Sequence, residues 1–190
     1  MSGEIVKLGT NWVQAKTDSI PAIVNGYYCE TRDVFQARLD SMRQLWIQQN
    51  VLSEDLVYLG AALAGEIGNN SFDHNGGHWP DVPGVFFGYD LSSKTVVLAD
   101  RGQGVLATLK KVKPELANDQ EALETAFKEK LSGRAPENRG NGLKFVRQTI
   151  HDQKLHLSFY SGTAQAELND TIITGSAQHM VQGCLAILSF

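Results

Sequence analysis

The stretch that decides how this chain folds and what it binds is GEIGNNSFDH, residues 65–74. On a helix, Glu66, Asn70 and His74 are spaced by four residues and form one polar row. This row lies one residue away from an apolar stripe that contains Ile67, which is roughly 100° around the helix. Amide and carboxylate oxygens at the edge of a core suit a metal–phosphate site, and the carboxylate can orient or deprotonate a nucleophile. The competing interpretation is an ordinary solvated helix face.

The residues on either side of this stretch predict a long helix. Ser53 is a good N-cap, and acidic residues at 54 and 55 suit the positive end of the helix dipole. Gly76-Gly77 is expected to end the helix. The apolar stripe consists of Leu56, Leu59, Leu63 and Ile67.

The rest of the chain mixes helical and strand patterns. Apolar residues recur at helical spacing over 34–49, where Asp33 is a candidate cap, and helices are also expected from Leu106, over 119–131 and over 143–150. Strands are expected over 84–89, 95–99, 155–159 and 184–188, whereas the first thirty residues give no clear pattern. We therefore predict an α+β two-layer sandwich, with a mixed, mainly antiparallel sheet covered on one face by helices. Residues 51–190 would form the domain, and residues 1–50 an N-terminal extension packed on it.

A second motif, Asp100-Arg101-Gly102-Gln103-Gly104, follows a predicted strand. An aspartate at a strand end can accept a hydrogen bond from an exocyclic amine of a ligand. The glycines at 102 and 104 permit positive φ and let a ligand approach the backbone closely. An ordinary tight turn would have the same sequence.

A third motif, Arg139-Gly140-Asn141-Gly142-Leu143, precedes a predicted helix. Glycines at a helix N-terminus leave backbone N–H groups free to bind an anion at the positive end of the dipole. Arg139 could also reach a γ-phosphate as a charge stabiliser. The motif is neither a P-loop nor a dinucleotide fingerprint, because the lysine and the third glycine of those patterns are missing. A plain helix-entry loop is the alternative.

The composition excludes several classes of partner. A formal net charge of −4 argues against a broad nucleic-acid surface. Two distant cysteines, Cys29 and Cys184, suit a reducing compartment. No apolar run is long enough to cross a bilayer, and the N-terminus has no signal-peptide pattern. We therefore expect a cytoplasmic protein without a membrane partner.

Taken in order, the three motifs closely resemble those of the GHKL superfamily, the histidine-kinase-like ATPases that include gyrase, the heat-shock chaperone ATPase and anti-sigma-factor kinases. The resemblance covers roughly residues 51–190 and implies the Bergerat ATP-binding fold with ATP and Mg²⁺ as ligands. It implies that Asn70 ligates Mg²⁺ and that Glu66 is the catalytic residue. The implied ATP-binding residues are Asn70, Asp73, His74, Asp100, Gly102, Gly104, Arg139, Gly140, Asn141, Gly142 and Leu143.

The resemblance also assigns roles along the nucleotide. Asp100 would bind the adenine amine, the third motif would hold the triphosphate, and residues 105–139 would form an ATP lid, with 132–141 as its mobile part. The last strand of the family often carries Gly-Thr, with the threonine hydroxyl near the adenine. Here the pair is Gly183-Cys184, so Thr163 or Thr171 is a candidate replacement.

The domain content narrows the choice within the family. No histidine precedes His74, so the phosphoaccepting module of a sensor kinase is not present in this sequence, and no transducer domain follows. The third motif is nearest to small anti-sigma-factor kinases. We therefore expect a regulatory serine/threonine protein kinase or ATPase that acts on a partner protein. The alternative is an ATP-gated binding switch with little or no phosphotransfer, and a homodimer is left open.

Overall fold

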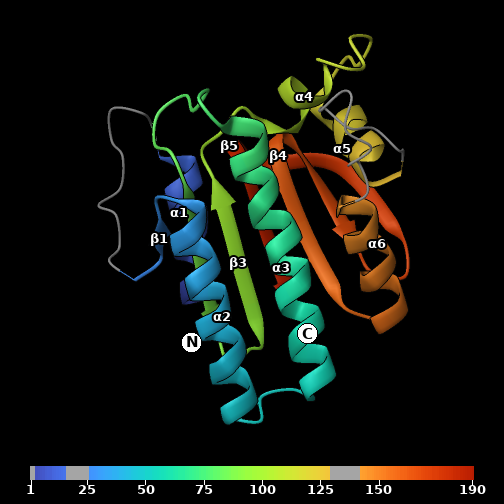
Figure 1. Cartoon of the computed structure of the whole chain (residues 1–190). Helices are drawn as coiled ribbons and strands as arrows, with labels where there is room; N and C mark the ends of the chain where they lie inside the picture. The colour runs from blue at the N-terminus through green and yellow to red at the C-terminus, as the bar shows by residue number, and fades with distance from the viewer. Residues whose placement is uncertain (1–2, 16–25, 129–141) are drawn as a thin grey trace.

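The computed structural model describes residues 3–15, 26–128 and 142–190. The proposed mobile segment 132–141, with Arg139, Gly140 and Asn141, lies outside them. The described residues form a five-stranded antiparallel sheet in the order β1-β2-β3-β5-β4 (Figure 1). The strands are β1 (Tyr28–Cys29), β2 (Val85–Asp90), β3 (Thr95–Asp100), β4 (His156–Leu168) and β5 (Ile172–Ser189). The helices are α1 (Glu4–Gln14), α2 (Arg32–Gln48), α3 (Glu54–Asn75), α4 (Gly104–Leu109), α5 (Asp119–Lys128) and α6 (Gly142–Gln153).

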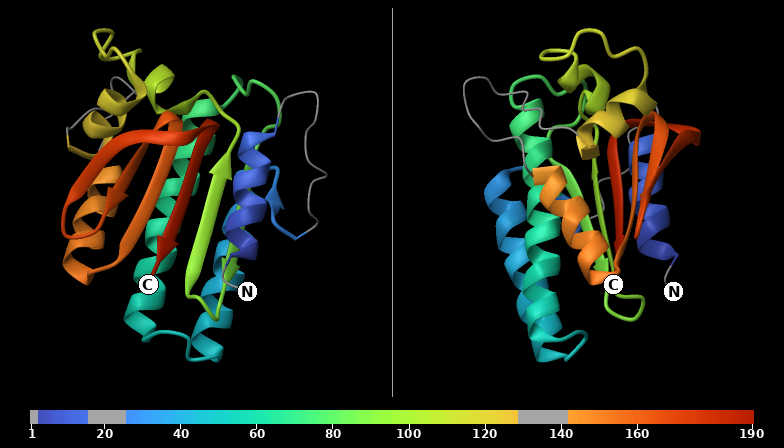
Figure 2. Two further views of the ribbon diagram at one scale, coloured as in Figure 1. Left: turned by 180° about the vertical axis from the view of Figure 1, so that it is seen from behind. Right: turned by 90° about the vertical axis from the view of Figure 1, so that its right-hand side faces the viewer.

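The predicted α+β class is confirmed, with two differences in the sheet. All strand pairs are antiparallel, so the sheet is not mixed. Helices lie on both faces: α2, α3 and α6 cover one face, and α1 covers part of the other (Figure 2). The alternation along β3 explains this, because Val96 and Leu98 enter the core beneath α2 and α3, whereas Val97 and Ala99 pack in a second core with α1.

Helix α1 and the short strand β1 are elements that the sequence patterns did not predict. Helix α1 buries Ile5, Gly9, Trp12 and Val13, a helical spacing that would have identified it. Its N-cap, Gly3, makes no side-chain capping bond, so no start signal precedes it. Gly9 lets the helix approach the sheet closely, since a β-carbon there would lie 2.7 Å from Val97 Cγ1.

Helix α3 begins and ends where predicted. The Ser53 hydroxyl accepts a hydrogen bond from the N–H of Leu56, and Gly76 is the C-cap. For α2 the cap is Thr31 rather than Asp33, and its hydroxyl accepts from the N–H of Val34. Four buried residues of α2 share one core with α3 and the sheet: Phe35, Leu39, Met42 and Trp46.

Strands β4 and β5 are longer than the sequence predicted and form one hairpin. Their register shifts between Ser161 and Gly162 and again between Gly162 and Ala164, which bends the pair. The hairpin carries the end of β5 to the centre of the sheet beside β3. No helix in the described ranges is both long and apolar enough to cross a bilayer.

Candidate functional site

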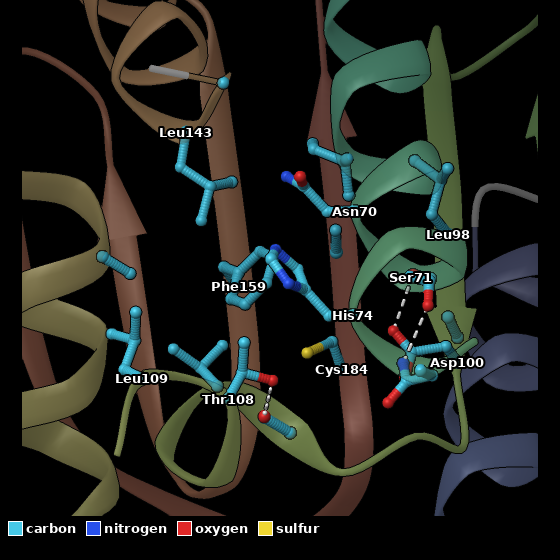
Figure 3. Close-up of a pocket in the computed structure, with 18 residues that line it drawn as sticks. Asn70, Ser71, His74, Leu98, Asp100, Thr108, Leu109, Leu143, Phe159 and Cys184 are labelled. Atoms are coloured by element: carbon cyan, nitrogen blue, oxygen red, sulfur yellow. Dashed lines mark hydrogen bonds between the residues drawn. The ribbon is translucent and has the colours of Figure 1, made fainter. Parts of the chain in front are cut away.

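A pocket opens between the C-terminal half of α3, the ends of β3 and β5, α4 and the start of α6 (Figure 3). It spans about 930 Å³ of space not filled by atoms, a figure that includes open solvent. All three motifs contribute to its lining. The predicted residues that line it are Asn70, His74, Asp100, Gly104, Gly142 and Leu143.

Asp100 forms the polar floor at one end of the pocket and is only 3% exposed. Its Oδ2 accepts a hydrogen bond from the Ser71 hydroxyl at 2.7 Å, and its Oδ1 accepts from the N–H of Gly102 at 2.8 Å. Burial raises the pKa of Asp100 to about 6, although these hydrogen bonds and those from Cys184 favour the charged form. The carboxyl group is therefore held in place by its neighbours and still lines the pocket.

The loop after Asp100 is held by the end of α3. Asn75 is buried, its Oδ1 accepts from the N–H of Gln103, and its Nδ2 donates to the carbonyl of Ser71. Gly102 lies directly beneath it, because a β-carbon there would lie 2.1 Å from Asn75 Nδ2. Gly102 therefore does not line the pocket and instead lets the loop pass under Asn75.

Gly104 and Ser161 fix the start of α4. Gly104 has a φ of +78°, which glycine adopts without strain. The Ser161 hydroxyl accepts from the N–H of Val105 at 2.9 Å and donates to the carbonyl of Gly183 at 2.9 Å. Helix α4, which lines the pocket through Val105, is thereby tied to β5.

Cys184 occupies the position beside Asp100 where the resemblance led us to look for a threonine. Burial, then the charge of Asp100, raises the pKa of Cys184 well above its ordinary value, so the thiol stays protonated. It can act as a weak donor. Neither candidate replacement lines the pocket, since Thr163 bonds to Asp119 and Thr171 bonds to Asn169.

The other end of the pocket is formed by α3 and the N-terminus of α6. A β-carbon on Gly142 would lie 2.5 Å from Glu66 Oε2 and 3.7 Å from Asn70 Nδ2. Both side chains therefore face the first residue of α6, where helix N–H groups lack intrahelical partners. An anion bound there would meet the positive end of the helix dipole.

His74 and Asp73 differ in position although they are adjacent. His74 points into the pocket, and burial, with a smaller effect from the charge of Lys111, lowers its pKa (Figure 3). Its imidazole is therefore neutral at pH 7. Asp73 forms an ion pair with Arg32 of α2 and is not among the lining residues. The geometry therefore does not favour the predicted contact between Asp73 and a nucleotide in this pocket.

Sequence reasoning missed several lining residues. Ser71 and Asn75 share a helical face, one residue around from the predicted polar row, and that spacing was a usable signal. No local signal marks the apolar walls, because they come from distant elements. These walls include Leu98, Val105, Leu109, Phe159 and Ala186.

The donor set at the α6 end suits a cation that is shared with a ligand. No cluster of three or more His, Cys, Asp or Glu residues able to hold a metal occurs in the described part of the chain. Mg²⁺ is commonly held by only one or two protein oxygens together with substrate phosphates and water. The amide oxygen of Asn70, beside Glu66 and the helix N-terminus, fits that pattern.

The chain matches no known family model, and no curated protein matches its sequence.

Proposed function

We propose that this chain binds Mg-ATP in the α3–β3–α6 pocket and is a regulatory protein of the histidine-kinase-like, Bergerat-fold type. Its activity would be that of a serine/threonine protein kinase or ATPase acting on a partner protein. The observation that carries the proposal is that one pocket has a buried acceptor, Asp100, at one end and a helix N-terminus, at Gly142, at the other. A nucleotide has the matching ends, a base with an amine and a chain of phosphates.

The Asp100 end suits adenine. An ionised carboxylate accepts from the exocyclic amine, and apolar residues such as Leu98 and Phe159 bury the faces of the ring. Ser71 and Gly102 already donate to the carboxylate, so its orientation is set before a ligand arrives. Preorganisation of this kind lowers the cost of binding.

The α6 end suits the phosphates. The free N–H groups at the helix N-terminus would bind phosphate oxygens, and Asn70 would supply an amide oxygen to the cation. Mg²⁺ would neutralise charge on the phosphates. Glu66 would orient or accept the proton of the attacking water or hydroxyl, a role that requires only that its carboxylate reach past the terminal phosphate.

A second candidate function, an ATP-gated binding switch, is favoured by the packing of α4 and α5. Leu109, Leu116 and Ala122 form a small cluster separate from the main core. Leu109 of α4 and Ala126 of α5 also line the pocket. A ligand could therefore change the position of this unit, and so a partner surface, without transferring phosphate.

Calorimetric titration with Mg-ATP tests the proposal. Loss of a charged hydrogen bond costs about 1.5–3 kcal/mol, so Asp100→Asn should weaken ATP binding roughly 10- to 150-fold. Asp90→Asn, at the end of β2 and not among the residues that line the pocket, is the matched control and should bind like wild type. Equal affinities in wild type and a folded Asp100→Asn protein would refute the assignment of Asp100 to the base.

Incubation with γ-labelled ATP separates the two functions. Label transferred to a second protein identifies a kinase, and release of labelled phosphate identifies an ATPase. Binding with neither outcome, in the presence of the partner, identifies the switch.

A further inference from the structure

We propose that Arg101 is a positioning residue that couples helix α1 to the base end of the nucleotide pocket, so that nucleotide affinity depends on α1 being docked on the sheet. The inference rests on the proposed function, because it concerns how the same pocket is held. Arg101 stands between Asp100, which lines the pocket, and Gly102, and its own side chain points away from the pocket. It is completely buried.

The guanidinium group of Arg101 joins three separate parts of the chain. Its Nε and Nη2 donate to Asp81 Oδ2 at 2.9 and 2.5 Å, and Asp81 lies in the segment between α3 and β2. Its Nη1 donates to the carbonyl of Trp12 in α1 at 2.6 Å. Its Nη2 also lies 3.5 Å from Gln182 Oε1 on β5. A planar group with several fixed donors can hold such partners at once, whereas a lysine cannot.

The bond to Trp12 caps the C-terminus of α1. The last carbonyls of a helix lack intrahelical partners and carry the negative end of its dipole. Helix α1 has no basic residue in its own last turn, and Arg101, the residue after β3, supplies the cation. The ring of Trp12 packs on Tyr28 and Phe86, so the same residue anchors α1 to the sheet.

The backbone at Arg101 leaves the pocket little freedom to adjust. A β-carbon on Gly183 would lie 2.2 Å from the carbonyl oxygen of Asp100 and 2.5 Å from the nitrogen of Gly102. Asn75 covers Gly102 from the other side. A shift of Arg101 would therefore move Asp100 and Gly102, whose N–H donates to the Asp100 carboxylate.

Coupling of this kind is reciprocal. If undocking of α1 weakens ATP binding, then ATP must stabilise the docked α1 by the same factor. A partner protein or a modification that lifts α1 from the sheet would lower nucleotide affinity without touching the pocket.

Two variants of the full chain test the inference. Arg101→Lys keeps the positive charge and loses the planar guanidinium group with its several fixed donors. The double variant Arg101→Met/Asp81→Leu replaces the buried pair by apolar side chains, an exchange that often leaves stability unchanged, and it still removes the bond to Trp12. The control is Met42→Ala, which opens a void where α2 packs in the main core. Met42 is not one of the residues that line the pocket. Mg-ATP affinity is measured by calorimetry, and hydrogen exchange is followed over residues 4–14 with and without Mg-ATP.

The expected result is a loss of at least tenfold in Mg-ATP affinity in both Arg101 variants, and less than twofold in Met42→Ala. ATP should slow exchange in α1 of wild type and of Met42→Ala, and this protection should disappear in the Arg101 variants. If wild type binds Mg-ATP and the Arg101 variants bind it with the same affinity, the inference is overturned and the proposed function is not. An equal loss in Met42→Ala, or α1 protection that survives in the Arg101 variants, would also overturn it. A wild-type protein that does not bind ATP would refute the proposed function, and the inference with it.

Discussion

The hydroxyl of Ser71 on α3 donates a hydrogen bond to Asp100 Oδ2, at the end of β3, at 2.7 Å. This bond links the helix and the strand that form two sides of the pocket. This bond favours the charged form of a carboxyl group whose pKa burial raises to about 6. Ser71 is therefore one of the donors that counteract burial and make Asp100 easier to ionise.

The first prediction is a pH dependence of adenosine binding. If the ionised Asp100 accepts from the adenine amine, affinity should be constant above about pH 6 and fall below it, by up to tenfold per pH unit. Adenosine is the probe because it has no phosphates that titrate in this range. Calorimetry between pH 5 and 8 measures the profile.

Ser71→Ala should move that profile. Loss of the hydroxyl raises the pKa of Asp100 further, so the fall in affinity should begin at a higher pH. Ser92→Ala, which removes a similar serine–aspartate bond at Asp90, outside the pocket, is the control and should leave the profile in place. A profile that is flat in wild type, or identical in Ser71→Ala, would show that Asp100 does not contact the ligand as an anion.

The second prediction concerns the stability of the free protein. The folded-state pKa of Asp100 lies above its ordinary value of 3.8, so folded wild type loses stability as pH rises from about 4 to 6 and does not regain it above. This difference corresponds to roughly 3 kcal/mol at most. Asp100→Asn should therefore be more stable than wild type at pH 7.5, by about 1–3 kcal/mol, although it binds ATP less well.

The advantage of Asp100→Asn should shrink at pH 5, where Asp100 in wild type is largely protonated. Urea denaturation at the two pH values measures both quantities. A variant that is less stable than wild type at pH 7.5 would mean that the carboxylate is a net stabilising group, contrary to its burial.

The third prediction compares two glycines of β5. Gly183 has a φ of +75°, and a β-carbon there would lie 2.2 Å from the carbonyl oxygen of Asp100. Gly183→Ala should cost about 2–5 kcal/mol of stability through backbone strain and overpacking. Gly175→Ala meets nothing within 4 Å and should change stability by less than about 0.5 kcal/mol. Similar losses in the two urea titrations would contradict the close packing described here.

The fourth prediction separates chemistry from binding at the α6 end. Glu66→Gln should keep Mg-ATP affinity within a few-fold and reduce turnover, by hydrolysis or transfer, by about 10²–10⁴-fold. Asn70→Ala should lose the Mg²⁺-dependent part of ATP binding as well as turnover, because it removes a metal ligand. Binding and product formation are measured on the same samples. Wild-type turnover in Glu66→Gln would eliminate the kinase mechanism and leave the switch.

Local signals in the sequence were sufficient for some elements and not for others. Ser53 and Gly76 mark the ends of α3 because capping depends on adjacent residues. Asp100 lies at a strand end as expected, although it is the last residue of β3 rather than the residue after it. The length of β4 and β5 and the placement of α1 depend on contacts between distant residues. Helix α1 in particular is anchored by Arg101, 89 positions from Trp12, a relation that no local pattern encodes.

The same limit applies to the site. The polar row of Glu66, Asn70 and His74 could be predicted from helical spacing, and the residues do face one pocket or its rim. Asp73 illustrates the converse, because membership of the motif did not reveal that it pairs with Arg32 on α2. The position of Cys184 beside Asp100 could not be derived from the sequence, because it depends on the pairing of β3 with β5.

The most direct test of the central claim, that Asp100 receives the base of ATP, is the relative affinity of wild type for Mg-ATP and Mg-GTP. Adenine presents an amine to an acceptor, whereas guanine presents the O6 oxygen at the equivalent position. A site built around a buried carboxylate should therefore bind ATP on the order of 100-fold more tightly or better. Calorimetric titration of the two nucleotides at pH 7.5 gives the ratio. Tight ATP binding with strong rejection of GTP is the predicted result, and equal affinities, or no ATP binding, would contradict the account.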